Sequence, residues 1–126
     1  MKRFVYQQLK DWKSNPKRKP LVLNGARQVG KTWLLKEFAR QEYIKMAYVL
    51  CRKNPIVKDI FRYDYNIDRI LRALSALSGV DITPGDTLLI LDEIQDVPEA
   101  LEALKYFREY APDYHVAVAG SLLGLS

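Results

Sequence analysis

The segment that most constrains this sequence is the glycine-rich stretch Gly25-Ala26-Arg27-Gln28-Val29-Gly30-Lys31-Thr32. It has the pattern G-x-x-x-x-G-K-T, and it lies between a short apolar run, Leu21 to Leu23, and a helix-like segment from Thr32 to Arg40. Glycine adopts backbone angles that other residues avoid, so such a loop can curl until its N–H groups form a concave anion site. In this strand, loop and helix context, the pattern predicts a phosphate-binding loop, or P-loop.

The pattern also assigns roles to the residues of the loop. The backbone amides from Gly25 to Thr32, with the positive end of the following helix, should hold phosphate oxygens. Lys31 should reach the β- and γ-phosphates as a point charge, and the Thr32 hydroxyl should bind Mg²⁺. The predicted ligand is therefore a nucleoside triphosphate with its magnesium ion.

A second chemical signal lies further along the chain, where the apolar run Leu88 to Leu91 ends in Asp92 and Glu93. This is the Walker B pattern. Open α/β sheets bind ligands at the carboxyl ends of their strands, so both acids are expected beside the phosphate loop. Asp92 would contact Mg²⁺ directly or through water, and Glu93 would act as general base on the water that attacks the γ-phosphate. The alternative is that two acids simply end a strand and begin a loop.

The acidic pair favours hydrolysis over small-molecule phosphorylation, since a kinase needs no glutamate to activate water. Switch GTPases tend to have D-x-x-G after this strand, whereas Ile94 and Gln95 follow here.

Ser121 follows the last apolar run and is predicted to sense the γ-phosphate; its alternative is a serine in a tight turn after Gly120. Glu93, Lys31 and Ser121 are thus the predicted catalytic residues, and Thr32 and Asp92 are the predicted metal ligands.

Apolar periodicity, prolines and asparagines predict alternating strands and helices along the whole chain. Strands are expected over residues 21–24, 45–51, 87–91 and 115–119, and helices over residues 2–13, 32–40, 55–61, 67–78 and 98–109. This βα alternation predicts an α/β three-layer sandwich with a mostly parallel sheet.

Length and charge narrow the remaining possibilities. A chain of 126 residues forms one nucleotide-binding domain rather than two domains. It has no signal-peptide pattern and no apolar run near the ~20 residues of a membrane span. The single cysteine, Cys51, excludes an internal disulfide, which favours a cytoplasmic protein.

The net charge of +5 suits an acidic partner such as a nucleotide, a nucleic acid or a membrane surface, or it serves solubility alone. His115 is expected to be structural.

In three segments the chain resembles the bacterial and archaeal AAA-type ATPases in which a P-loop domain precedes a C-terminal domain of unknown function. The matching segments are Gly25 to Thr32, Leu91 to Gln95, and Ala119 to Gly124; Arg27, Gln28 and Gln95 are the most specific positions. The resemblance implies ATP as the nucleotide and the strand order 5-1-4-3-2, with an additional strand between the P-loop strand and the Walker B strand. It also implies ATP hydrolysis with Glu93 as the base, coupled to conformational change. The same resemblance implies packing of the first helix near the adenine, and a homo-oligomer in which a neighbour supplies an arginine finger.

Two departures accompany this resemblance. The second strand ends in Leu50-Cys51-Arg52, where such relatives tend to have asparagine and acidic residues. The fifth strand, the helical lid and the C-terminal domain would all follow Ser126, so we expect the N-terminal portion of a longer protein, truncated before these elements. The first strand would then be an exposed edge.

A function of another class stays open beside the ATPase. The chain would then be a nucleotide-dependent binding or switch module with little hydrolysis of its own, with nucleic acid as its partner. The net charge and the basic run Lys17-Arg18-Lys19 motivate this alternative.

Overall fold

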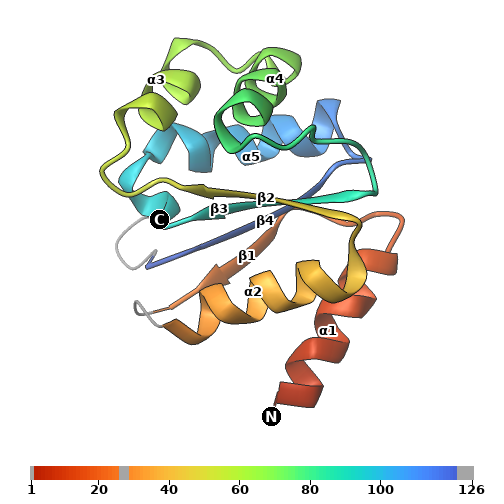
Figure 1. The fold of residues 1–126 in the computed structure, drawn as a ribbon. Coiled ribbons are helices and arrows are strands. Elements are labelled where there is room, and N and C mark those ends of the chain that lie inside the picture. The colour runs from red at the N-terminus through yellow and green to blue at the C-terminus, as the bar shows by residue number, and fades with distance from the viewer. Residues whose placement is uncertain (1, 26–28, 122–126) are drawn as a thin grey trace.

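The computed structural model describes residues 2–25 and 29–121 (Figure 1). The elements follow in the order α1 (Lys2–Ser14), β1 (Leu21–Asn24), α2 (Val29–Glu42), β2 (Lys45–Leu50), α3 (Pro55–Tyr63), α4 (Ile67–Ser78), β3 (Thr87–Asp92), the 3₁₀ turn η1 (Ile94–Asp96), α5 (Pro98–Tyr110) and β4 (His115–Gly120). Each strand and helix predicted from the sequence is present, with some ends shifted. The largest shifts are in α2, which begins before Thr32 and continues to Glu42.

The strands form one parallel sheet in the order β1-β4-β3-β2. This order confirms the strand arrangement expected for these four strands, with β4 inserted between the P-loop strand and the strand that ends in the acids. Figure 1 shows α3, α4 and α5 on one face of the sheet and α1 and α2 on the other. The fold is therefore the predicted three-layer α/β sandwich. Because the described strands are parallel, their carboxyl ends all lie at the same end of the sheet.

The two central strands, β3 and β4, are buried along their whole length. Each face of the sheet has its own hydrophobic cluster, centred on Phe61, Ile70 and Phe107 on the α3–α5 face and on Leu35, Phe38 and Tyr43 on the α2 face. This burial on both sides explains why β3 and β4 read as continuous apolar runs. The exposed fraction of Val22 is 43%, so β1 is less buried than its apolar sequence suggests, because it lies at an edge of the described sheet.

Local capping explains where the helices on the α3–α5 face begin and end. Asn54 caps α3 by accepting a hydrogen bond from the Val57 amide, and Asn66 caps α4 in the same way. Gly79 ends α4 in the left-handed conformation, with φ of 74°. These are the start and stop signals that the sequence indicated for this region.

Candidate nucleotide and metal site

The carboxyl ends of the central strands meet the beginning of α2 at a small hollow. The described residues that line it come from the glycine loop, the acidic pair and the end of β4: Gly25, Lys31, Thr32, Asp92, Glu93, Ala119 and Gly120. Five of the predicted site residues, Gly25, Lys31, Thr32, Asp92 and Glu93, are thus brought together, whereas Gly30 and Ser121 are not among the lining residues. Ala26, Arg27 and Gln28 lie outside the described residues, and Val29 is the first residue of α2.

Gly25 begins the loop, and its lack of a side chain leaves room for the lysine. A Cβ atom at position 25 would lie 2.4 Å from the Lys31 Nζ, which is far inside van der Waals contact. The Gly25 amide donates to the Gly120 carbonyl oxygen at 3.2 Å, so the start of the loop is tied to the end of β4. The glycine therefore lets the ammonium group of Lys31 fold over the strand end.

Asp92 connects the two predicted motifs through its carboxylate. Its Oδ2 accepts hydrogen bonds from the Thr32 hydroxyl at 2.8 Å and from the Tyr48 hydroxyl at 2.6 Å. Its Oδ1 accepts one from the Glu93 amide at 3.0 Å. The exposed fraction of Asp92 is only 6%, and three donors fix the orientation of this buried carboxylate. A buried acid held in this way at a strand end is well placed to be a metal ligand or to orient a metal-bound water.

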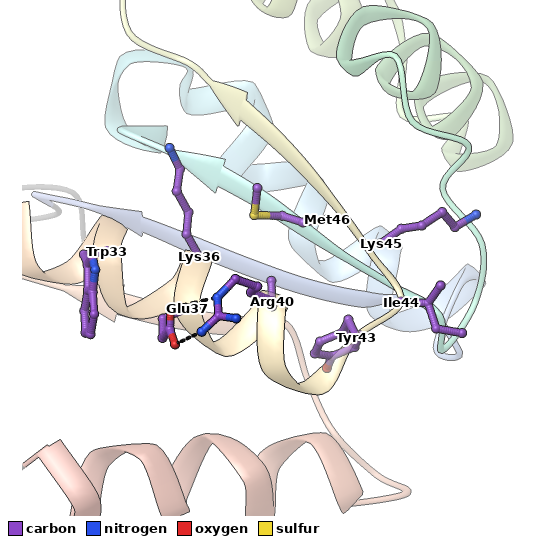
Figure 2. Close-up of a pocket in the computed structure, with 9 residues that line it drawn as sticks. Trp33, Lys36, Glu37, Arg40, Tyr43, Ile44, Lys45 and Met46 are labelled. Carbon is purple, nitrogen blue, oxygen red and sulfur yellow. Dashed lines mark hydrogen bonds and ion pairs between the residues drawn. The ribbon is translucent and has the colours of Figure 1, made fainter.

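Tyr48 is a site residue that the sequence did not reveal. Burial is the main cause that raises the pKa of its hydroxyl, with the hydrogen bond to Asp92 second, so the group stays protonated and donates. The Lys36 Nζ lies 4.0 Å from the centroid of the Tyr48 ring. In Figure 2, Lys36 extends from α2 towards the strands. Tyr48 lies two positions before the end of β2, and strand periodicity places it on the α2 face with Met46 and Leu50. That spacing was the available signal.

Glu93 has an unusual backbone conformation for a residue with a side chain. Its φ of 54° and ψ of 45° lie in the left-handed region, where glycine is favoured. Its amide is bound to Asp92, its carbonyl accepts from the Asp96 amide at 3.2 Å, and its Oε1 accepts from Gln95 Nε2 at 2.7 Å. Such strain persists only where the surroundings over-determine it, and it is frequent at functional sites.

Ser121 directly follows β4 and is partly exposed. It is not among the described residues that line the hollow. Its role as a sensor of the γ-phosphate stays a prediction from its position in the sequence.

The residues present fit a magnesium ion better than a metal held by protein alone. Within residues 2–25 and 29–121, no group of three histidine, cysteine, aspartate or glutamate side chains could hold a metal. The Thr32 Oγ1 and the Asp92 Oδ2 are oxygen atoms of the kind that Mg²⁺ prefers as ligands, and they lie 2.8 Å apart. Magnesium usually takes one or two protein oxygens and completes its shell with water and substrate phosphates, so this sparse oxygen set suits it.

The more spacious pockets of the molecule lie elsewhere. One, of about 430 Å³, follows α2 and the start of β2 and shares no lining residue with the hollow (Figure 2). Its charged residues include Glu37 and Arg40, which pair with each other at 3.1 Å; the hydrogen bond from Arg40 lowers the pKa of Glu37. The described residues that line this pocket include none of the predicted site residues, so pocket size does not indicate the predicted site in this protein.

His115 and Cys51 do not belong to the site. His115 lies in a buried aromatic cluster, with its Nδ1 2.6 Å from the Tyr43 hydroxyl, which agrees with the structural role expected for it. Cys51 is buried, and burial raises the pKa of its thiol to about 12, which leaves it unreactive.

The fold is the α/β architecture of a P-loop NTPase-like domain, with β4 between the loop strand β1 and the acidic strand β3. The family model described as AAA domain matches residues 17–126. The chain therefore belongs to the AAA domain family, whose members have the P-loop ATPase type of nucleotide-binding domain. No match was found among curated proteins. Among the described residues, none of the helices is both long and apolar enough to cross a membrane.

Proposed function

We propose that this domain binds Mg-ATP and hydrolyses it, and that turnover is coupled to a change of conformation. The observation that carries the proposal is the hydrogen bond from the Thr32 hydroxyl to the Asp92 carboxylate at 2.8 Å, across 60 positions of sequence. It joins the phosphate loop to the acidic pair at the edge of the sheet where parallel α/β folds bind ligands.

Binding would use the backbone amides of the loop, the start of α2 and the ammonium group of Lys31. Amides at a helix start carry partial positive charge, and they suit the oxygens of a polyphosphate. Thr32 and Asp92 would hold the magnesium ion, with Tyr48 keeping the Asp92 carboxylate in place. When bound, the ion would neutralise charge that develops on the phosphate oxygens.

Hydrolysis would depend on Glu93 as the general base. The carboxylate would accept a proton from water while the water oxygen forms a bond to the terminal phosphorus. The bond from that phosphorus to the bridging oxygen breaks, its electron pair stays on ADP, and inorganic phosphate is released. Lys31 would stabilise charge on the phosphate oxygens, and Ser121 would contact the terminal phosphate.

Turnover by this chain alone is expected to be slow. No arginine is among the described residues that line the hollow. An arginine finger is typically worth about 10³ to 10⁵ in the rate of phosphoryl transfer, so a neighbouring subunit of a homo-oligomer would have to supply it. Binding is therefore the more sensitive test of the proposal.

The test is a calorimetric titration of the chain with Mg-ATP, with Lys31→Ala as the site variant and Lys58→Ala as the control. Lys58 is an exposed lysine of α3 that does not line the hollow, and its replacement by alanine removes the same charge. We expect saturable binding by the wild type and by Lys58→Ala, and at least about tenfold weaker binding by Lys31→Ala, because a charge-assisted contact to phosphate is lost. Absence of binding at millimolar ATP, or equal binding by all three proteins, would refute the site.

The alternative, a nucleotide-dependent module that binds nucleic acid, draws on the net charge of +5. Within the run Lys17-Arg18-Lys19, the Arg18 guanidinium donates to the carbonyl oxygens of Lys13 and Asn15 at the end of α1, so it has a local structural task. A salt titration of single- and double-stranded DNA and RNA binding tests this alternative, because phosphate contacts weaken steeply with salt.

A further inference from the structure

The side chain of Gln95 lies between the end of β4 and the carboxylate of Glu93. Its Nε2 donates to the Glu93 Oε1 at 2.7 Å. Only the NH₂ side of the amide can donate to a carboxylate, so this contact fixes the orientation of the amide. We propose that Gln95 is a positioning residue that holds the Glu93 carboxylate in the orientation from which it acts on water. The proposal rests on the hydrolytic function proposed above.

The Glu93 backbone is already fixed at both ends of the residue. The amide donates to Asp92 and the carbonyl accepts from Asp96, in a left-handed conformation that η1 immediately follows. A glutamate side chain still has several rotatable bonds beyond this anchored backbone. Gln95 supplies a hydrogen bond at the far end of the side chain, where the direction of the proton-accepting oxygens is decided.

Gly120 leaves space for the amide of Gln95 at the end of β4. A Cβ atom at position 120 would lie 2.2 Å from the Gln95 Oε1 and 3.2 Å from the Ile94 amide nitrogen. Gly120 is not among the glycines with positive φ, so the lack of a side chain here provides space rather than backbone freedom. The end of β4 therefore forms a slot that only glycine leaves open for Gln95.

The oxygen of the Gln95 amide is buried, and within the described part of the chain it has no hydrogen-bond partner. Buried polar atoms are nearly always paired, so an unpaired one in a native fold calls for an explanation. The hydrogen bond from Nε2 to Glu93 explains the unpaired oxygen, because the amide can donate to the carboxylate only when its oxygen faces Gly120.

These contacts also reach the phosphate loop. The Gly25 amide donates to the Gly120 carbonyl at 3.2 Å, while the open side of Gly120 receives Gln95. The strand end that is hydrogen-bonded to the first residue of the loop therefore also leaves the space that Gln95 occupies beside the proposed base.

The first test needs neither ATP nor turnover. In ¹⁵N-labelled protein, the side-chain NH₂ signals of Gln95 are identified by their loss in Gln95→Met, which keeps the length of the side chain and removes the donor. We expect Glu93→Gln to shift these signals, and to leave the side-chain NH₂ signals of Gln7 unchanged. Gln7 is the matched control because its amide donates to an exposed carboxylate, Asp11 Oδ1, at 3.0 Å on α1. Gln95 signals that do not respond to Glu93→Gln overturn the proposal.

The second test uses the rate of ATP hydrolysis in single-turnover assays, with the ATP affinity measured for the same variants. Gln95→Met should lower the rate about 10- to 100-fold with little change in ATP affinity, as loss of a supporting contact to a functional group typically does. Gln95→Glu removes the donor and puts a like charge beside Glu93, so it should lower the rate at least as much as Gln95→Met. An unchanged rate in Gln95→Met, or an equal loss of ATP affinity, overturns the positioning role.

Gly120→Ala gives an independent check through a double-mutant cycle. The added methyl group should displace Gln95, so the combined variant should be no slower than Gln95→Met alone. Additive losses would show that Gly120 acts without Gln95. If the wild type binds no Mg-ATP, the proposed function fails, while the amide signals of Gln95 still decide whether the contact exists.

Discussion

The two ends of the sheet carry similar buried groups with different surroundings. At the carboxyl ends, the Tyr48 hydroxyl lies 2.6 Å from the Asp92 carboxylate, and at the amino ends the Tyr43 hydroxyl lies 2.6 Å from His115 Nδ1. The first pair adjoins a hollow beside the glycine loop. The second pair is packed against aromatic rings: Trp12 makes an edge contact with His115, and Phe38 makes one with Tyr43.

Under the proposed function, Asp92 serves a ligand, whereas His115 serves the fold. Asp92 has an ionisable carboxylate, hard oxygen donors beside it and a strained neighbour in Glu93, whereas His115 is enclosed and its hydrogen bond is satisfied by Tyr43. Both non-glycine residues with positive φ among those described, Lys53 and Glu93, follow carboxyl ends of strands. Backbone strain is thus found at the end of the sheet with the proposed site.

The largest effect expected at the carboxyl end is on turnover. Glu93→Gln keeps the size of the side chain and removes the base, so single-turnover ATP hydrolysis should fall by about 10² to 10⁴ while Mg-ATP binding persists. Calorimetry and phosphate release on the same preparation check both parts. Turnover close to that of the wild type would remove Glu93 from the mechanism and weaken the contrast between the two ends.

At the amino end, the expected effect is a pH-dependent stability. Burial, reinforced by Arg18 and Lys13, lowers the pKa of His115 to about 4 from 6.5. The folded state therefore favours the neutral ring: its stabilisation is complete above pH 6.5 and is lost as the pH falls towards 4. The loss amounts to up to about 3 kcal/mol in the free energy of unfolding. Urea unfolding between pH 7 and pH 4 should show a smaller decline in His115→Gln than in the wild type. Equal declines would contradict a buried neutral histidine.

The same substitution at Tyr48 and at Tyr43 compares the two ends of the sheet directly. Tyr48→Phe should lower the affinity for Mg²⁺, measured at fixed ATP, about tenfold. Residues that hydrogen-bond to metal ligands typically contribute that much. Tyr43→Phe should leave Mg-ATP binding unchanged and lower the free energy of unfolding by about 1 kcal/mol, the usual value of a hydrogen bond. Magnesium titrations at fixed ATP and urea unfolding measure the two quantities. The same magnesium dependence in both variants would show that the ends do not differ in function.

The smallest effect expected is the release of backbone strain. Lys53→Gly and Glu93→Gly should each raise the free energy of unfolding by up to about 1 kcal/mol, because glycine adopts positive φ without a Cβ clash. Only Glu93→Gly should lose turnover. Urea unfolding with phosphate release checks both variants. Destabilisation of both would show that the left-handed conformations are not strained.

The sequence predicted the elements and the neighbourhood of the two motifs, but it did not predict the contacts that hold them. Glycines, capping asparagines and continuous apolar runs act locally or through strand burial, so the order of elements could be read directly. The link from Tyr48 to Asp92 depends on the register of β2 against β3, which pairs Leu50 with Asp92. Gln95 was conspicuous only as part of a resemblance, because its partners, Glu93 and Gly120, meet through a left-handed turn that no pattern indicates.

The most direct test of the central claim is an amide NMR titration of the ¹⁵N-labelled chain with Mg-ATP. The nucleotide site is assigned to the carboxyl ends, so the amide signals of Gly30, Thr32 and Asp92 should shift with saturation, and those of Tyr43 and His115 should stay in place. Shifts centred on Tyr43 and His115, or no shifts at millimolar Mg-ATP, would contradict the account.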